Sequence, residues 1–276
     1  MFNQIFFEMA LRNLFGKNQE PEICKLVRII SQNSVVIDVG ANRGTYSFPI
    51  VQKLKKPGHL YAFEPIPELF NYLEKGLAGR DTFKVYSFAC GDRQSVKRIK
   101  LPINNGQLSM GSASFINSFK DFETIPVKII SIDSLKISKV NFIKIDVEGF
   151  ETLVLRGAIK TIERNRPVIL VEIDWNMGNN YFPELKKIIA ELDYAVMALT
   201  GGKMIKVNLP EFNSRKLNFH KTGYRNNFFL VPKEEYVSIN KILSKKNYFY
   251  NSKKLMLLIN ILLTRSFSYS INNRHS

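Results

Sequence analysis

The sequence predicts an α/β fold: a doubly wound, mostly parallel sheet of seven strands with an inserted β-hairpin and loop. Short runs of β-branched residues alternate along the chain with segments whose apolar residues recur at helical spacing. The first run, residues 35–39, breaks into a turn with two glycines, Gly40 and Gly44, and a helix-like segment follows. Five successive predicted strands each end at an acidic residue. In such sheets the ligand lies beyond the carboxyl ends of the strands.

Length and composition favour one globular domain with an added segment at each end. The chain has 276 residues, is 45% hydrophobic and carries a formal net charge of +16. We expect a helical lead-in over residues 1–33, the domain over residues 34–232 and a basic extension over residues 233–276. The two cysteines and three histidines do not cluster, which favours a reducing compartment and argues against a zinc site or a Ser-His-Asp triad.

The positive charge fits three situations: a nucleic-acid partner, an anionic membrane surface, or a basic surface without a dedicated partner. The lysines are spread over most of the chain, which favours the last and makes nucleic acid the least favoured. No apolar run is long enough to span a bilayer, and the N-terminus lacks the basic region and cleavage site of a secretory signal. A cytoplasmic location is therefore expected.

The predicted elements follow one another between clear turn signals. The strands of the sheet are expected at residues 34–39, 59–63, 83–88, 140–145, 167–173, 195–199 and 228–231. The helices are expected at residues 22–31, 45–54, 67–77, 151–163 and 182–192. A hairpin is expected around Gly201 and Gly202.

The pattern changes between residues 96 and 132. Residues 96–101 and 127–132 alternate apolar with polar side chains, as exposed edge strands do. Between them, residues 104–124 are rich in Asn, Ser and Gly and contain three phenylalanines. Such a long loop is uncommon in a compact domain unless it is functional. The alternative is an ordinary excursion at the sheet edge.

The strand ends carry a series of acids. They are Asp38, Glu64, Asp92, Asp146 with Glu148, and Glu172 with Asp174. An acid in or just after a buried strand costs free energy unless it binds something. Because all these ends meet at one edge of the sheet, the acids are expected to form a site.

Glu64 lies where an acid binds the ribose hydroxyls of an adenosine cofactor, at the end of the second strand. The alternative is that it caps the next helix. A dinucleotide site has three glycines, whereas Asn42 stands here in place of the middle one. A cofactor without phosphates but with a charged amino-acid end, such as S-adenosylmethionine, fits this turn better.

A set of motifs in fixed order then resembles the FkbM family of S-adenosylmethionine-dependent methyltransferases. The motifs cover residues 34–231 and are Val-Ile-Asp-Val-Gly-Ala-Asn-Arg-Gly-Thr-Tyr-Ser (36–47), Ala-Phe-Glu-Pro-Ile-Pro (62–67), Ala-Cys-Gly-Asp (89–92), Gly-Ser-Ala-Ser-Phe (111–115), Ile-Asp-Ser-Leu (132–135), Ile-Lys-Ile-Asp-Val-Glu-Gly-Phe-Glu (143–151), Leu-Arg-Gly-Ala (155–158) and Pro-Val-Ile-Leu-Val-Glu-Ile (167–173). The resemblance implies the Rossmann-like fold of class I methyltransferases.

The resemblance also implies cofactor-binding residues. The methionine end would lie against Gly40, Ala41, Asn42 and Gly44, with Asp38 holding its amino group through the turn. The ribose would bind Glu64, beside Pro65, and the adenine would lie by residues 89–92, with Ala89 and Asp92 at the ends of that stretch. Cys90 stands where the family often has Leu, a mild departure.

Methyl transfer to a hydroxyl needs a group that accepts the proton, and a carboxylate can do this as a general base. Asp146 and Glu148 are the candidates, with Glu172 third. Their alternative roles are structural: Glu148 or Glu151 capping the next helix and Asp146 orienting the turn. Asp146 and Glu172 could also share a divalent metal such as Mg²⁺, although no ligand spacing requires one.

The loop at residues 104–124 would then be a lid over the acceptor, with Ser112, Ser114 and Phe115 near the site. The family implies O-methylation of a sugar, a glycan precursor or a related metabolite. Two alternatives are an NAD-linked nucleotide-sugar oxidoreductase and an RNA methyltransferase or RNA-binding protein. The basic extension could dock on an anionic membrane or on a glycosyltransferase, or be a solvated tail.

Overall fold

The structure is a computed structural model that describes residues 21–173, 181–200, 203–212 and 226–245. Three sequence predictions fall outside these residues: the start of the helical lead-in, the turn at Gly201 and Gly202, and the end of the basic extension. Asp174, the last predicted strand-end acid, also lies outside them. No helix within the described residues is both long and apolar enough to cross a bilayer.

The main sheet confirms the predicted fold class. Its strands are ordered β11-β10-β12-β9-β8-β1-β2-β3. They are β1 (Val35–Val39), β2 (His59–Phe63), β3 (Phe83–Tyr86), β8 (Val140–Ile145), β9 (Val168–Glu172), β10 (Tyr194–Thr200), β11 (Lys203–Val207) and β12 (Asn227–Pro232). The five strands from β9 to β3 are parallel, whereas β12 runs antiparallel to both β9 and β10. The sheet has eight strands rather than seven, because β11 adds an antiparallel edge to β10.

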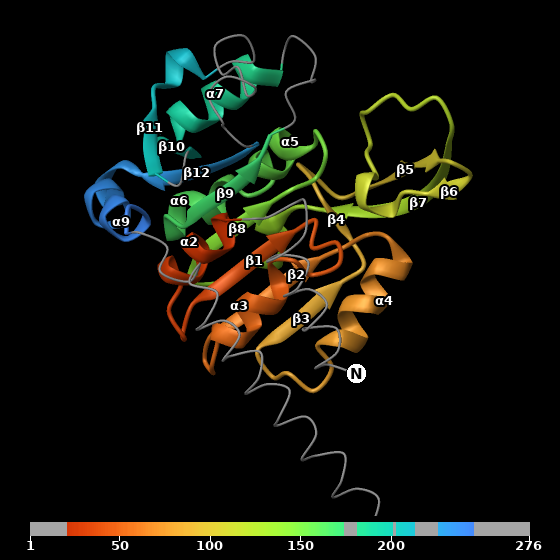
Figure 1. Cartoon of the computed structure of the whole chain (residues 1–276), viewed down its shortest axis with the longest axis horizontal. Coiled ribbons are helices and arrows are strands. Elements are labelled where there is room, and N and C mark those ends of the chain that lie inside the picture. The colour runs from red at the N-terminus through yellow and green to blue at the C-terminus, as the bar shows by residue number, and fades with distance from the viewer. Residues whose placement is uncertain (1–20, 174–180, 201–202, 213–225, 246–276) are drawn as a thin grey trace, which may run out of the picture.

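Helices cover both faces of this sheet (Figure 1). The helices are α2 (Glu22–Ile29), α3 (Ser47–Lys53), α4 (Pro67–Gly76), α5 (Glu151–Arg156), α6 (Ile159–Asn165), α7 (Tyr181–Glu191) and α9 (Tyr236–Leu243). Successive residues of each strand point to opposite faces, and the apolar ones fall into two separate core clusters. One cluster contains residues of α5, α6 and α7, and the other contains residues of α2, α3, α4 and α9. The chain is therefore doubly wound, as predicted.

The predicted single helix at residues 151–163 is wrong: the chain forms α5 and α6 with a break at Gly157. A Cβ at Gly157 would lie 1.8 Å from the backbone oxygen of Gly91, so the two backbones touch there. The side chain of Asp133 then accepts the first free N–H groups of α6, from Lys160 at 3.1 Å and Thr161 at 2.8 Å. Neither contact can be read from helical periodicity.

A second, small sheet holds the inserted segment. Its order is β4-β7-β5-β6, with β4 (Ala89–Cys90), β5 (Ser95–Asn104), β6 (Gln107–Leu108) and β7 (Phe122–Ile130). The predicted loop at residues 104–124 therefore contains β6, the short helix η1 (Met110–Ser112) and the start of β7. Figure 1 shows β5, β6 and β7 projecting to one side of the main sheet.

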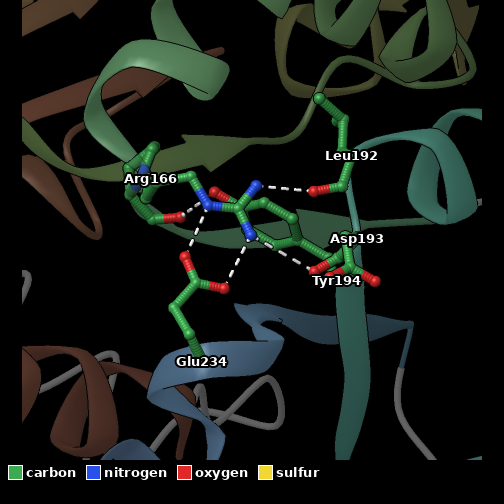
Figure 2. Close-up of polar contacts among 6 residues, drawn as sticks. Arg166, Leu192, Asp193, Tyr194 and Glu234 are labelled. Atoms are coloured by element: carbon green, nitrogen blue, oxygen red, sulfur yellow. Dashed lines mark hydrogen bonds and ion pairs between the residues drawn. The ribbon is translucent and has the colours of Figure 1, made fainter.

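The first residues of the predicted basic extension are attached to the core. Lys25 on α2 is fully buried and donates to the backbone oxygens of Leu243 and Lys245 at the end of α9. Figure 2 shows a second attachment, in which Arg166 binds both carboxylate oxygens of Glu234 at 2.6 and 2.8 Å. The guanidinium also donates to the backbone oxygen of Leu192 at 2.6 Å. The division into lead-in, domain and extension itself stays a prediction.

Candidate active site

The glycine turn after β1 is held against two neighbouring strands. Gly40 has φ +76°, and a Cβ on it would lie 1.8 Å from the backbone oxygen of Asp146, just after β8. The N–H groups of Gly40 and Ala41 both donate to the oxygen of Phe63 at the end of β2, at 3.0 and 3.1 Å. Asn42, also left-handed at φ 50°, closes the turn. The turn thus needs glycine at position 40 for close approach as well as for backbone conformation.

Glu64 links this turn to the helix that follows β2. One carboxylate oxygen accepts the N–H of Asn42 at 2.7 Å and the other accepts that of Ile66 at 2.9 Å. The side chain is 4% exposed, and burial raises the pKa of Glu64 to about 7, while the two N–H bonds act in the opposite direction. Glu64 thus bonds to the residue before α4 (Pro67–Gly76) but does not cap that helix, as the alternative prediction had it, and it also lines the cavity described next.

A cavity of about 60 Å³ lies where these strand ends meet. Of the residues predicted for the site, those that line it are Gly40, Asn42, Glu64, Pro65, Ala89, Phe115, Asp146 and Glu148. Apolar residues not named from the sequence complete the wall, among them Ile66, Leu69, Ile99, Met110 and Phe150. Three of the lining side chains are carboxylates, and no lysine or arginine of the described residues lines the cavity.

The other predicted site residues lie outside the cavity lining formed by the described parts of the chain. They are Asp38, Ala41, Gly44, Asp92, Ser112, Ser114 and Glu172. Asp38 is buried beneath the turn, where it accepts a hydrogen bond from Ser47 at 2.6 Å, and burial raises its pKa. Asp92 instead lies 3.7 Å from the guanidinium of Arg93. Their predicted roles in binding stay predictions.

Lys144 is the feature that the sequence did not reveal. It is 1% exposed, and its ammonium lies 3.0 Å from a carboxylate oxygen of Asp146 and 4.7 Å from the centre of the Tyr46 ring. It is the direct register partner of Asp38 on the adjacent strand. Burial opposes its charge, but Asp146, Glu172 and Asp38 together raise the pKa of Lys144, so it is a buried cation.

The two leading catalytic candidates both line the cavity. Asp146 is 31% exposed at its side chain and has one oxygen on Lys144. Glu148 has a left-handed backbone, φ 50°, which turns the chain away from β8. The ammonium of Lys144 is a positive charge beside Asp146, and the metal shared by Asp146 and Glu172 stays a prediction. Among the described residues, no group of three or more His, Cys, Asp or Glu side chains could hold a metal ion.

Glu151 holds the turn that follows β8. Its carboxylate accepts the N–H of Gly149 at 2.9 Å and the hydroxyl of Tyr181 at 2.5 Å. The side chain is 1% exposed, and burial raises the pKa of Glu151. The turn after β8 is therefore fixed by a carboxylate that stands outside the cavity.

The predicted lid loop lies against the glycine turn. A Cβ on Gly111 would lie 3.2 Å from the side-chain nitrogen of Asn42, and Phe115 packs on Phe150 with ring centres 4.7 Å apart. Ser114 is fully buried: its hydroxyl donates to the backbone oxygen of Glu148 at 2.7 Å and accepts two backbone N–H groups of its own loop. Ser114 therefore anchors the loop to the turn after β8, whereas Ser112 is exposed.

The sheet order and the cavity at its strand ends give the chain the Rossmann-like fold of a methyltransferase domain. The model of the methyltransferase FkbM domain matches residues 38–196, more than half of the chain, so the chain belongs to the FkbM family. No curated protein matches the chain.

Solved structures of methyltransferases resemble the chain at low identity. The FkbM methyltransferase of Methylobacillus flagellatus is 14% identical, with a TM-score of 0.47 over 83% of this chain and 57% of that protein. The chain thus spans little more than half the length of that relative. An O-methyltransferase from Bacillus cereus in complex with SAH is 15% identical, with a TM-score of 0.46 over 84% of this chain and 90% of that one. A SAM-dependent methyltransferase from Aquifex aeolicus is 14% identical, with a TM-score of 0.41 over 83% and 97% of the two chains.

Proposed function

We propose that this methyltransferase transfers the methyl group of S-adenosylmethionine to a hydroxyl oxygen of a sugar, a glycan precursor or a related metabolite. One observation carries the proposal: in a chain of net charge +16, the cavity at the strand ends is lined by three carboxylates and by no basic residue that the structure describes. Such a wall favours a cationic ligand and disfavours the pyrophosphate of a dinucleotide.

The residues present fit the cofactor by their chemistry. Glu64 offers a buried carboxylate to the ribose hydroxyls, because each of its oxygens accepts one backbone N–H and keeps a further lone pair. Ile66, Leu69 and Ile99 offer an apolar wall for the adenine ring. The turn at Gly40 presents bare backbone to the amino-acid end.

The bound cofactor would supply a methyl group on a positively charged sulfur. The chain's own task is to place an acceptor oxygen in line with that methyl group and to take up its proton. Asp146 is our candidate for the proton acceptor, because it combines exposure to the cavity with a fixed orientation on Lys144. Glu148 is the second candidate. Phe115 and Phe150 limit the access of water from the loop side.

Cofactor binding requires the loop to move. The cavity holds about 60 Å³, whereas sites for small molecules measure roughly 300 Å³ or more. Gly111 of the loop and Asn42 of the glycine turn both line the cavity, and a Cβ on Gly111 would lie only 3.2 Å from the side-chain nitrogen of Asn42. The wall formed by β1, β2 and β8 belongs to the main sheet. We therefore expect the loop at residues 104–124 to move when the cavity enlarges.

Calorimetry with S-adenosylmethionine and with NAD tests the cofactor. We expect S-adenosylmethionine to bind and NAD to give no heat, and the reverse result would refute the proposal. Glu64→Ala should weaken S-adenosylmethionine binding, whereas Asp146→Asn should retain binding and lower turnover. An Asp146→Asn enzyme with full activity would remove Asp146 from the mechanism.

The acceptor is tested separately, by incubation with labelled S-adenosylmethionine and panels of sugars, nucleotide sugars and RNA. We expect label on a sugar oxygen, located by mass spectrometry of the product. Label on a nitrogen or carbon atom, or on RNA, would refute O-methylation of a sugar while leaving the cofactor assignment intact.

A further inference from the structure

The small sheet presents one face that its own core does not use. In the antiparallel pair of β5 and β7, directly opposed residues share a face. On one face the pairs are Val96 with Lys128, Arg98 with Pro126, Lys100 with Thr124 and Pro102 with Phe122. We call these eight residues the outer face. Pro102 is buried, Lys100 and Thr124 are half-buried, and the other five are exposed.

The opposite face of the same two strands is buried at its centre, although Lys97 and Glu123 on it are exposed. Its residues Ile99, Leu101, Val127 and Ile129 are at most 5% exposed and form a core cluster with Phe150. Ile99 also lines the catalytic cavity. The small sheet therefore packs one face on the active site and turns the outer face away from it.

Two large apolar side chains of the outer face are open to solvent. Val96 is 66% exposed and Phe122 is 42% exposed, and they belong to a group of only five exposed large hydrophobic residues in the described parts of the chain. They stand at opposite ends of the face, since Val96 begins the pairing series and Phe122 closes it. Pro126, between them, is also exposed.

The outer face carries three basic side chains: Arg98 and Lys100 lie between these two apolar residues, and Lys128 lies directly opposite Val96. None of the eight outer-face residues is acidic. Arg98 donates to the side chain and the backbone oxygen of Thr124, both at 2.7 Å. Lys100 lies 5.6 Å from the centre of the Phe122 ring and donates to the backbone oxygen of Asn117 at 3.2 Å. These partners are uncharged, so they hold the cations along the sheet without neutralising them.

We propose that the outer face docks the enzyme on an anionic membrane surface. Lysine and arginine are attracted to the negative potential of such a surface, and exposed apolar side chains enter the headgroup region. The outer face offers both kinds of side chain. A nucleic-acid site would instead need a platform of aromatic rings for base stacking, and Phe122 is the only aromatic residue on this face. Docking here would hold the active site close to the bilayer, since β5 also contributes Ile99 to the cavity wall.

Flotation of the full chain with phosphatidylcholine vesicles, with and without phosphatidylglycerol, tests the proposal. We expect binding only to vesicles that contain phosphatidylglycerol. The triple variant Arg98→Gln/Lys100→Gln/Lys128→Gln should bind about tenfold more weakly or worse. Val96→Ser/Phe122→Ser should bind severalfold more weakly and keep its dependence on phosphatidylglycerol.

Two controls separate this face from the overall charge. The triple variant Lys55→Gln/Lys75→Gln/Lys160→Gln removes three exposed charges outside the small sheet, and Val237→Ser removes an apolar residue that is 80% exposed on α9. Both should bind within about twofold of the wild type, because the proposed attraction acts close to the surface. The proposal is overturned if the control triple variant loses as much binding as the outer-face triple variant. It is equally overturned if the wild-type chain does not bind vesicles that contain phosphatidylglycerol. It is also overturned if the outer-face triple loses binding to a single-stranded RNA but not to vesicles. Circular dichroism of each variant checks that it is folded.

Discussion

Replacing Gly40 by alanine should lower the free energy of unfolding by more than the strained backbone conformation alone would. At φ +76° an alanine is strained, which costs about 1–2 kcal/mol. Its Cβ would also lie 1.8 Å from the oxygen of Asp146 and would need at least 3.0 Å. The end of β1 must therefore move away from the residue that follows β8.

That movement has a defined cost. It strains the hydrogen bond from Asp146 to the oxygen of Val39, 3.1 Å, and those from Gly40 and Ala41 to Phe63. Each such bond contributes about 1 kcal/mol to stability. With the backbone strain, we expect a total loss of about 3–5 kcal/mol in the free energy of unfolding.

The chain contains a matched control. Gly79 has nearly the same backbone, φ +77°, but nothing lies within 4 Å of the position its Cβ would take. Gly79→Ala should therefore show only the backbone cost, about 1–2 kcal/mol. Urea unfolding of both variants, with calorimetric titration of S-adenosylmethionine, gives the comparison. Equal losses in the free energy of unfolding for the two variants would show that the close approach of Gly40 to the backbone oxygen of Asp146 has no effect on stability, and would refute the reasoning.

Three further predictions concern charged groups. Lys144→Met removes the buried ammonium from among its carboxylate partners, so we expect the free energy of unfolding, measured in urea, to fall by about 3 kcal/mol or more. Arg166→Lys cannot reproduce the two bonds to Glu234 and should lower the free energy of unfolding by about 1–2 kcal/mol. Arg156→Lys is the control: Arg156 makes a single 2.7 Å contact with Glu184 in a more exposed pair, so the loss should be smaller. Because the pKa of Glu234 is lowered to about 2, the contribution of this ion pair is present above its ordinary pKa and is lost as pH falls toward 2. The difference in stability between wild type and Arg166→Lys should therefore shrink toward the part that comes from the backbone bond to Leu192. Glu64 has its pKa raised to about 7, so the native state keeps a proton that the unfolded chain releases near 4.5. Stability should therefore decrease by about 1–3 kcal/mol as pH rises from about 5 to 7, and a Glu64→Gln protein with the same slope would refute this assignment.

The buried parallel strands could be predicted closely from the sequence, because their signal is local. Strands β2 and β8 have the predicted bounds, and β1 differs by one residue. The failures arise where one backbone touches another. The break at Gly157 depends on Gly91, which is distant in sequence, and β11 joins the sheet only through pairing with β10.

The site could be predicted only in part for the same reason. Acids at strand ends can be read from the sequence, but sheet order decides which of them meet. Strand β1 lies between β2 and β8, so Glu64, Asp146 and Glu148 reach the cavity beside Gly40, whereas Glu172 on β9 lies one strand further out. Lys144 reads as an isolated lysine in an apolar strand, and only the pairing of β8 with β1 places it beside Asp38.

Lys144 also explains how the sheet tolerates so many acids at one edge. A buried carboxylate without a partner would be protonated or would destabilise the fold. A single ammonium, in contact with Asp146 and close enough to Asp38 and Glu172 to interact with both, offsets part of that cost from inside the sheet. It does so without lining the cavity, so the wall stays acidic toward a ligand although the chain as a whole is strongly basic. The positive charge that the acids need for stability thus comes from a lysine within the sheet that contacts Asp146, and no lysine or arginine of the described residues lines the cavity where a cationic methyl donor would bind.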